Sequence, residues 1–184
     1  VQAVARLRQM GLKLVMLTGD VEATARAIAD KAGISEVRAS IRPEEKAREI
    51  ERLIKGGEHV AMVGDGVNDA PALARAHVGM AMGSSIDVAV ETGDVVLSGG
   101  EMRSVATALA LSRAVMWNIR QNLFWAFIYN IILIPLAAGI LHPFPSIPEF
   151  LRHLHPIMAA LAMSLSSVTV VSNSLRLYKS RLDV

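Results

Sequence analysis

The chain has 184 residues, a formal net charge of +2 and no cysteine. So small a charge, with no arginine-rich run interleaved with aromatic residues, argues against nucleic acid as a partner, and the lack of cysteine excludes a disulfide framework. Most acidic residues lie in the first hundred positions, whereas the stretch from Leu123 to Val171 is strongly apolar. We therefore predict a soluble α/β part followed by a membrane part. Because Val1 opens directly in a helical pattern, without an initiator methionine or a signal peptide, we expect the chain to be the carboxyl-terminal part of a longer polypeptide.

The first predicted strand covers 12–17, follows a helix over 1–10 and ends in the tripeptide Thr18-Gly19-Asp20. A threonine hydroxyl and free amides at the end of such a strand can donate hydrogen bonds to a phosphoryl oxygen. The same tripeptide is also a common helix cap, so by itself it does not identify a site.

A helix over 21–32, a short strand over 37–40 and a helix beginning at Pro43 come next. Lys46 lies in the first turn of that last helix, where a cation opposes the helix dipole at a cost of about 0.3 kcal/mol or more at the surface. This unfavourable position hints at another use for Lys46, although most surface lysines merely solvate a helix.

The stretch 60–73 carries the most informative pattern, an apolar strand followed by Gly-Asp-Gly-Val-Asn-Asp-Ala-Pro-Ala-Leu over 64–73. The carboxyl ends of parallel strands are where open α/β sheets bind ligands. Asp65 and Asp69, with Asn68 and two glycines beside them, offer hard oxygen ligands and close backbone approach, which suits Mg²⁺ held against a phosphate. An Asp-Gly turn followed by an Asp helix cap is the alternative interpretation.

Strands over 78–82 and 94–97 complete the predicted sheet, with a short capped helix over 83–89 between them. From about Arg103 the apolar spacing becomes that of one long helix, which no proline or glycine interrupts before Pro135. We expect this unbroken helix to join the sheet to the membrane and to transmit movement between them.

Two segments, 123–141 and 156–177, are apolar and long enough to cross a bilayer. Arginine and lysine flank their outer ends, so the positive-inside rule places both ends of the chain in the cytoplasm and the loop 142–155 outside. Polar side chains at membrane depth are costly unless they face a protein interior, where they line a pathway or make interhelical hydrogen bonds. Four such candidates are Tyr129, Asn130, Met163 and Ser167.

The loop also carries three histidines: His142, His153 and His155. Imidazole binds copper, but these residues lack strict ligand spacing, so we interpret them as solvated.

The stretch 64–73 resembles the hinge motif of the P-type ATPases, whose phosphorylation domain belongs to the haloacid dehalogenase superfamily. Lys46, placed after Pro-x-x, and the run Gly-x-x-x-Asp-Val-Ala over 83–89 fit the same pattern. The resemblance implies an α/β fold with a haloacid dehalogenase-like, Rossmann-like parallel sheet that is incomplete in this chain, followed by an α-helical transmembrane hairpin.

Tyr-Asn in one membrane helix and Met-x-x-x-Ser in the next resemble the heavy-metal P-type ATPases that export monovalent copper. A thioether selects a soft ion, Cu⁺ or Ag⁺, whereas hard divalent ions call for carboxylates. The membrane segments contain no Asp or Glu, which argues against zinc, cadmium and calcium pumps.

The resemblance implies an ATP-driven pump with an aspartyl-phosphate intermediate, whose aspartate lies outside this chain. It implies these roles: Asp65 and Asp69 as ligands of Mg²⁺; Thr18, Gly19, Asp20, Lys46 and Asn68 in the catalytic set; and Tyr129, Asn130, Met163 and Ser167 as ligands of the transported ion. ATP is the implied substrate. The implied partners are the lipid bilayer, the remaining domains of the same polypeptide and a copper chaperone, in a bacterial inner membrane.

The predicted organisation is a phosphorylation domain over 1–102, a stalk helix over 103–122, a transmembrane helix over 123–141, an external loop over 142–155, a last transmembrane helix over 156–177 and a cytoplasmic tail over 178–184. Three alternatives stay open: a membrane-anchored haloacid dehalogenase-type phosphatase, a P-type pump for another heavy metal, and a non-enzymatic binding or assembly module.

Overall fold

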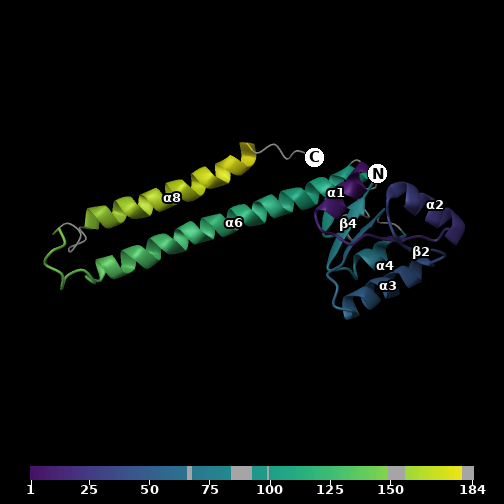
Figure 1. Cartoon of the computed structure of the whole chain (residues 1–184), viewed down its shortest axis with the longest axis horizontal. Coiled ribbons are helices and arrows are strands. Elements are labelled where there is room, and N and C mark those ends of the chain that lie inside the picture. The colour runs from purple at the N-terminus through teal and green to yellow at the C-terminus, as the bar shows by residue number, and fades with distance from the viewer. Residues whose placement is uncertain (66–67, 84–92, 99, 149–155, 180–184) are drawn as a thin grey trace. The chain divides into compact units, whose positions relative to one another are not determined.

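The computed structural model describes residues 1–65, 68–83, 93–98, 100–148 and 156–179, and it divides into two compact units, Val1–Leu109 and Ala110–Asp183 (Figure 1). The described elements are α1 (Gln2–Gln9), β1 (Val15–Leu17), α2 (Glu22–Ala32), β2 (Glu36–Arg38), α3 (Pro43–Lys55), β3 (Ala61–Gly64), α4 (Ala70–Leu73), β4 (Val78–Met82), β5 (Val95–Leu97), α6 (Met102–Ala137) and α8 (Pro156–Lys179).

The strands of the first unit form two separate parallel ladders. β1 pairs with β2, and β3, β4 and β5 form a second ladder in that order. Parallel pairing requires a crossover, and α2 and α4 lie between the paired strands in sequence. β1 and β3 therefore each have one neighbour among the described strands, which confirms the expected incomplete parallel sheet.

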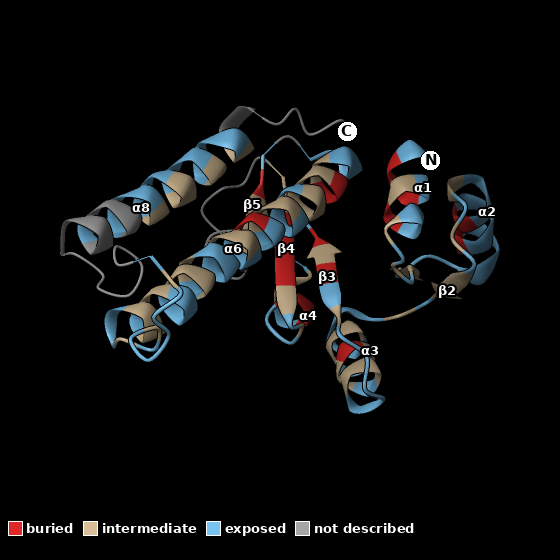
Figure 2. Cartoon of the chain, turned by 60° about the vertical axis from the view of Figure 1, so that its left-hand side comes forward, coloured by how far each residue is buried: buried red, intermediate tan, exposed pale blue. Residues whose placement is uncertain are grey.

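Two apolar clusters hold this unit together, and β4 contributes to both because alternate residues of a strand point to opposite faces. Met80 belongs to the cluster that includes the start of α6, and Ala81 belongs to the cluster beneath α3 and α4. Figure 2 shows the resulting concentration of buried residues on β4. Leu17, at the end of β1, packs against the second cluster, so both ladders share a core.

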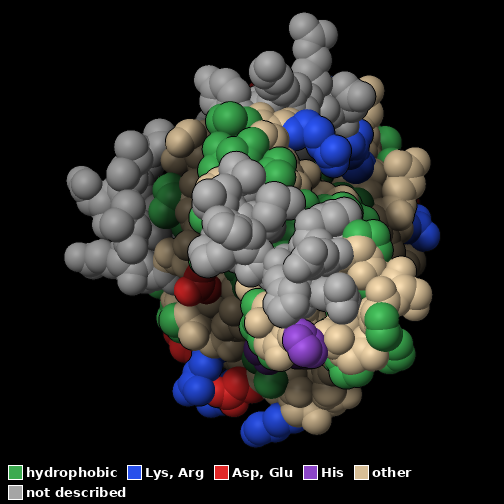
Figure 3. Space-filling model, turned by 90° about the vertical axis from the view of Figure 1, so that its left-hand side faces the viewer, with side chains coloured by type: hydrophobic (Ala, Val, Ile, Leu, Met, Phe, Trp, Pro, Cys, Tyr) green, Lys and Arg blue, Asp and Glu red, His purple; other side chains and the backbone are tan. Residues whose placement is uncertain are grey.

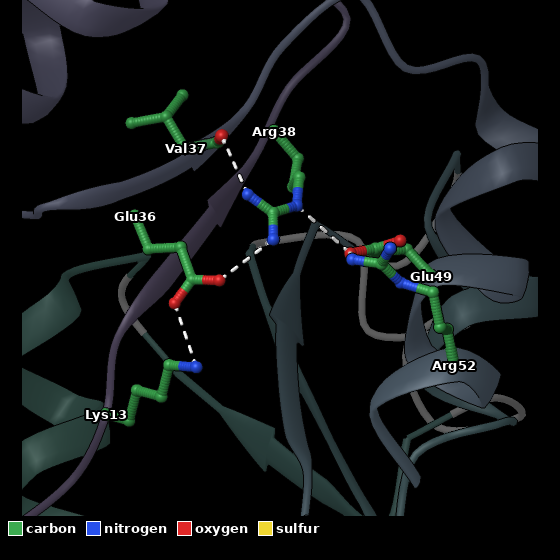
Figure 4. A network of polar contacts seen from close by, with 6 residues as sticks. All are labelled: Lys13, Glu36, Val37, Arg38, Glu49 and Arg52. Atoms are coloured by element: carbon green, nitrogen blue, oxygen red, sulfur yellow. Dashed lines mark hydrogen bonds and ion pairs between the residues drawn. The ribbon is translucent and has the colours of Figure 1, made fainter. Parts of the chain in front are cut away.

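An ion-pair network ties β2 to α3 (Figure 4). Glu36 accepts from Lys13 and Arg38 at 2.9 Å each, and Arg38 also donates to Glu49 at 3.2 Å. Arg52 donates to the same Glu49 carboxylate at 2.8 Å. The hydrogen bond and charge of Lys13, reinforced by Arg38, hold the pKa of Glu36 below its ordinary value.

Three of the predicted strands are shorter in the structure, and β5 begins at Val95 rather than at residue 94. Gly11 has a φ of 79° and Leu12 N donates back to Leu7 O at 3.2 Å, so the chain is still turning where the strand was expected to begin. The strand predicted over 37–40 covers Glu36–Arg38 instead, because the chain turns at Ser40, whose φ is 55°. The helix predicted over 83–89 falls almost wholly outside the described residues.

α6 runs without a break from Met102 through Pro135 to Ala137, as the absence of an earlier breaker predicted. It is the one helix among the described residues that is both long and apolar enough to cross a membrane by length and composition. It ends before the predicted limit of Leu141 because the backbone turns at Gly139, with a φ of 81°. Figure 3 views the molecule from the end where α6 gives way to that turn, and hydrophobic side chains and a histidine are visible there.

Candidate phosphoryl-transfer site

Thr18, which directly follows the carboxyl end of β1, is held in place by hydrogen bonds. Its backbone N–H donates to Arg38 O at 3.0 Å, which continues the pairing of β1 with β2. Its hydroxyl donates to the Asp20 carboxylate at 2.8 Å, and the Asp20 N–H donates back to the hydroxyl oxygen at 3.2 Å. Asp20 thus orients the hydroxyl of Thr18, and the exposed Gly19 between them leaves the backbone open to a ligand.

The loop before α3 holds this tripeptide from the other side. Ile41 N donates to Thr18 O at 3.1 Å, and Ser40 N donates to Asp20 O at 2.8 Å. Ser40 reaches that position in the left-handed region, which a non-glycine residue adopts at a cost of roughly 1 kcal/mol. The turn therefore fixes Thr18 relative to the helix that carries Lys46.

Lys46 and Asp69 form an ion pair with an Nζ–Oδ1 distance of 2.6 Å, and their side chains are only 17% and 13% exposed. Lys46 comes from the first turn of α3 and Asp69 from the N-cap of α4, so the pair connects two helices. Gly64 allows this contact, because a Cβ there would lie 2.6 Å from the Asp69 carboxylate oxygen. The unfavourable position of Lys46 on its helix is explained by this partner.

Asp65 follows directly after β3 and is exposed. Within the described part of the chain its carboxylate has no hydrogen bond or ion pair, and the exposed Asn68 has none from its side chain either. The carboxylates of Asp65 and Asp69 therefore differ in how accessible they are to a metal ion, although both were predicted to bind Mg²⁺.

The donor set fits Mg²⁺ only in part. No group of three His, Asp or Glu side chains converges among the residues that the structure describes. Mg²⁺ commonly binds through one or two carboxylates, with waters and phosphate oxygens completing its octahedron, so the exposed Asp65 suits it. Among the described contacts, Oδ1 of Asp69 is paired with Lys46, whereas neither carboxylate oxygen of Asp65 has a partner.

A cavity of about 640 Å³ lies between the two ladders. Consecutive residues line it on both sides, 11–17 leading through β1 and 57–63 leading into β3, together with Asp69. Side chains of one sheet face would line it only at alternate positions, so the strand edges themselves bound this cavity. Unpaired backbone groups of β1 and β3 consequently face a common space.

The four candidate ion ligands all lie in the second unit, and the structure does not join them across the two helices. Asn130 donates to Ala126 O at 3.0 Å, and the Ser167 hydroxyl donates to Met163 O at 3.3 Å. Tyr129 lies beside Trp125, with ring centroids 6.3 Å apart, and Met163 is 68% exposed. The polar groups of Asn130 and Ser167 are thus satisfied within their own helices. In the loop His142 is exposed, and His153 and His155 lie outside the described residues.

Two groupings were missed by sequence reasoning. His59 and His77 lie together at the start of β3 and β4, with ring centroids 5.0 Å apart, because those strands are neighbours. A cluster of amides also joins α6 to α8. Its members are the side-chain amides of Asn118, Gln121, Asn122 and Asn173, together with the hydroxyl of Ser174. Asn118 and Asn122 are one helical turn apart, a spacing that the sequence does contain.

Comparison with known proteins agrees with this geometry. Residues 1–77 match the family model of haloacid dehalogenase-like hydrolases. The chain is 54% identical over 178 residues to a probable copper-transporting ATPase, PacS, of Synechocystis, covering 97% of this chain and 23% of the relative. It is 51% identical over 176 residues to a copper-exporting P-type ATPase of Legionella pneumophila, covering 96% and 23%. It is 53% identical over 180 residues to a silver exporting P-type ATPase of Salmonella typhimurium, covering 98% and 21%.

Among solved structures, a zinc-transporting PIB-type ATPase in the E2.Pi state is 37% identical, with a TM-score of 0.78, and the match covers 96% of this chain and 27% of that one. The parallel strands and the residues at their carboxyl ends define a haloacid dehalogenase-like fold. The family is narrower than the fold: the chain belongs to the heavy-metal P-type ATPases, and with the long apolar α6 it is part of a membrane protein. It spans about a quarter or less of the length of the curated relatives named above.

Proposed function

We propose that the chain forms part of an ATP-driven pump that exports monovalent copper or silver through an aspartyl-phosphate intermediate. The observation that carries the proposal is the juxtaposition at the end of β3 of a free carboxylate, Asp65, with the Lys46–Asp69 pair, beside a cavity bounded by strand edges. The names of the relatives, three of them copper or silver transporters at 51–54% identity, support the same substrate class.

The cavity between β1 and β3 suits one further parallel strand, which we assign to another part of the same polypeptide. Neighbouring strands are spaced by about 4.8 Å, so a single inserted strand would pair with both free edges and merge the two ladders. Its carboxyl end would then lie between Thr18 and Asp65. We propose that this end carries the aspartate that accepts the phosphoryl group.

In the proposed reaction an oxygen of that aspartate attacks the γ-phosphorus of ATP, and the bond to the bridging oxygen of ADP breaks. Thr18 would turn its hydroxyl hydrogen from Asp20 to a phosphoryl oxygen, with Gly19 giving backbone access and the Asp20 N–H keeping its hydrogen bond to the hydroxyl oxygen. Lys46, held by Asp69, would offset the charge of the transferred group, and Asn68 would orient the loop. Mg²⁺, held through Asp65, would add further neutralisation of the phosphate charge. Attack of water on the phosphorus would later release phosphate and restore the carboxylate.

For the transported ion, the thioether of Met163 favours Cu⁺ or Ag⁺ over hard divalent ions. The similar solved structure is a zinc-transporting ATPase, so a zinc pump is the alternative. Neither membrane segment carries an Asp or Glu, however. Because Asn130 and Ser167 bond within their own helices, we infer that further ligands come from other helices of the same polypeptide. The proposal further includes the phosphorylation-domain and hairpin boundaries stated above, a copper chaperone as donor, and both ends of the chain on the cytoplasmic side of a bacterial inner membrane.

The test is phosphoenzyme formation by the intact pump from radiolabelled ATP. Copper(I) should stimulate labelling, and Asp65→Ala should abolish the Mg²⁺-dependent signal. Met163→Ala should still be labelled from inorganic phosphate but should need more Cu⁺ for labelling from ATP. Glu44→Ala, an exposed change on α3, is the matched control and should behave as the unmodified pump. Undiminished labelling of Asp65→Ala, or stimulation by Zn²⁺ instead of Cu⁺, would contradict the proposal.

A further inference from the structure

α6 and α8 are joined by a compact cluster of side-chain amides. Asn118, a buried polar residue, donates from Nδ2 to the backbone carbonyl of Asn173 at 2.9 Å. Asn122 donates to Asn118 Oδ1 and to Ser174 Oγ, both at 3.0 Å. Asn173 donates to Asn122 Oδ1 at 2.8 Å and reaches Gln121 Oε1 at 3.4 Å. Each of the three asparagines therefore contacts the opposite helix.

Several other polar side chains of the two helices bond within their own helix. Ser164 and Thr169 donate to carbonyls one turn back in α8, at 2.9 and 2.8 Å, and Asn130 does the same in α6. Such bonds satisfy the side chain without constraining a neighbouring helix. A cross-helix network requires both the rotation and the axial position of the helices to be correct, because every donor meets a particular acceptor.

We propose that Asn118, Asn122 and Asn173 form a positioning clamp that sets the rotation and register of α6 against α8, and thereby places the ion ligands on one side of the hairpin. The inference rests on the proposed transport function for the meaning of those ligands. The clamp itself stands on the hydrogen bonds alone. None of its members is a proposed ligand.

The rotation follows from helical periodicity of about 100° per residue. Tyr129 comes about two turns after Asn122, so it lies on nearly the same face, toward α8, and it is half-buried. Asn130 is turned by one further residue and is exposed. On α8, Met163 and Ser167 are rotated around the helix axis away from the side on which Asn173 lies, and both are exposed as well.

Because α6 and α8 are right-handed and antiparallel, the rotation of Asn130 on α6 and that of Met163 and Ser167 on α8 place these residues on the same side of the hairpin. The clamp would thus bring Asn130 and the Met163–Ser167 pair to one open flank, where a further helix could complete an ion site. A rotation of either helix by one residue would move one set of ligands off that flank and break the amide contacts together.

The experiment uses the full chain in lipid nanodiscs, and the absence of native cysteine makes introduced labels specific. Spin labels at Ile134→Cys on α6 and Val168→Cys on α8, both exposed positions more than one helical turn from the nearest clamp residue, report the distance between the helices away from the clamp. The unmodified clamp should give a single narrow distance population. The triple variant Asn118→Leu, Asn122→Leu, Asn173→Leu, which keeps side-chain size and removes the amide groups, should lose it. Ser164→Ala with Thr169→Val removes polar groups that bond within α8 and should leave the distribution unchanged.

Helix content is measured alongside by circular dichroism. If the triple variant loses helix, the single change Asn118→Leu decides the matter, since it removes the bond to the Asn173 backbone and the bond from Asn122 but leaves the Asn122–Ser174 and Asn173–Asn122 bonds in place. An unchanged distribution in a helical variant would overturn the clamp, whereas loss of the narrow population in both the triple variant and the control pair would show that the effect is not specific to the amides.

A second readout separates the clamp from the transport proposal. In the intact pump, Asn122→Leu should raise the Cu⁺ concentration for half-maximal phosphorylation while the maximal level is kept, because the ligands remain but are misplaced. If the unmodified pump shows no Cu⁺-dependent phosphorylation, the transport proposal fails and the distance measurement still judges the clamp. If Cu⁺ activation is present and unaltered by Asn122→Leu, the positioning role is overturned.

Discussion

The two units of this chain differ in how they hold their candidate site residues. In the first unit Lys46 and Asp69 meet from different helices, and backbone bonds join Thr18 to the turn that precedes α3. In the second unit the candidate ligands Asn130 and Ser167 bond to their own helices. The candidate phosphoryl-transfer site is therefore largely preorganised within this chain, whereas the proposed ion site would have to be assembled with helices from other parts of the polypeptide. Variants can break or sharpen this contrast.

Removing one member of the Lys46–Asp69 pair should have the largest effect on stability. Lys46→Met leaves the Asp69 carboxylate 13% exposed and without its counter-ion, which should lower the free energy of unfolding by about 3 kcal/mol. Denaturant unfolding of the full chain in detergent micelles, followed by circular dichroism, measures the change.

The control is Arg26→Ala, which removes an exposed pair with Glu22 whose side chains are 70% and 66% exposed. Its expected cost is less than about 0.5 kcal/mol. The double variant Lys46→Met, Asp69→Asn should recover part of the loss, because no unpaired charge remains. Equal effects of Lys46→Met and Arg26→Ala would remove the distinction between a preorganised site and an ordinary surface pair.

Gly64→Ala tests the same preorganisation through packing. The added Cβ would lie 2.6 Å from the Asp69 carboxylate oxygen and 2.7 Å from its Cβ, so Asp69 must move and loosen its contact with Lys46. We expect a loss of about 2 kcal/mol in unfolding free energy. Gly19→Ala is a suitable comparison for stability, since its Cβ would meet only Ile41 O at 3.5 Å. A neutral Gly64→Ala would mean that the turn after β3 accommodates a side chain.

Much of the first unit could be predicted because its signals are local. The apolar strands, the proline at the start of α3 and the glycine-rich turn after β3 each specify their own segment, and their order implies a parallel sheet. The pairing of Lys46 with Asp69 could not be deduced that way. Both residues were identified, but which acid would remain free for a metal depended on contacts between α3 and α4.

In the second unit, the long helix could be predicted but the contacts between the helices could not. The length and apolarity of α6 follow directly from its composition, and its passage through Pro135 agrees with the absence of an earlier breaker. The amide cluster was missed because an asparagine in an apolar helix has several possible acceptors, including its own backbone. Only the register between α6 and α8 decides which acceptor Asn118 and Asn173 reach.

Glu36→Gln tests the ion-pair network that joins β2 to α3, and its effect on stability should be smaller. Lys13 and Arg38 lower the folded-state pKa of Glu36, so its contribution is present above the ordinary pKa of a glutamate and is lost as pH falls through the lowered folded value. At pH 7 the variant should be less stable by no more than about 1 kcal/mol, because the partners are partly exposed. Unfolding measured at descending pH should show the two proteins converging in strongly acidic solution; a constant difference would exclude the ionised carboxylate as the cause.

Ser167→Ala should have the smallest effect on stability. It therefore tests most directly whether the two units differ in preorganisation. Its hydroxyl donates only to Met163 O, one turn back at 3.3 Å, and the helix backbone keeps its own hydrogen bonds without it. The expected change in unfolding free energy is within about 0.5 kcal/mol. The same variant in the intact pump should nevertheless weaken activation by Cu⁺, since the oxygen would be needed once a further helix brings the remaining ligands. A matched decrease in stability and activation would instead mean that Ser167 supports the helix, and that the second unit is preorganised in the same way as the first.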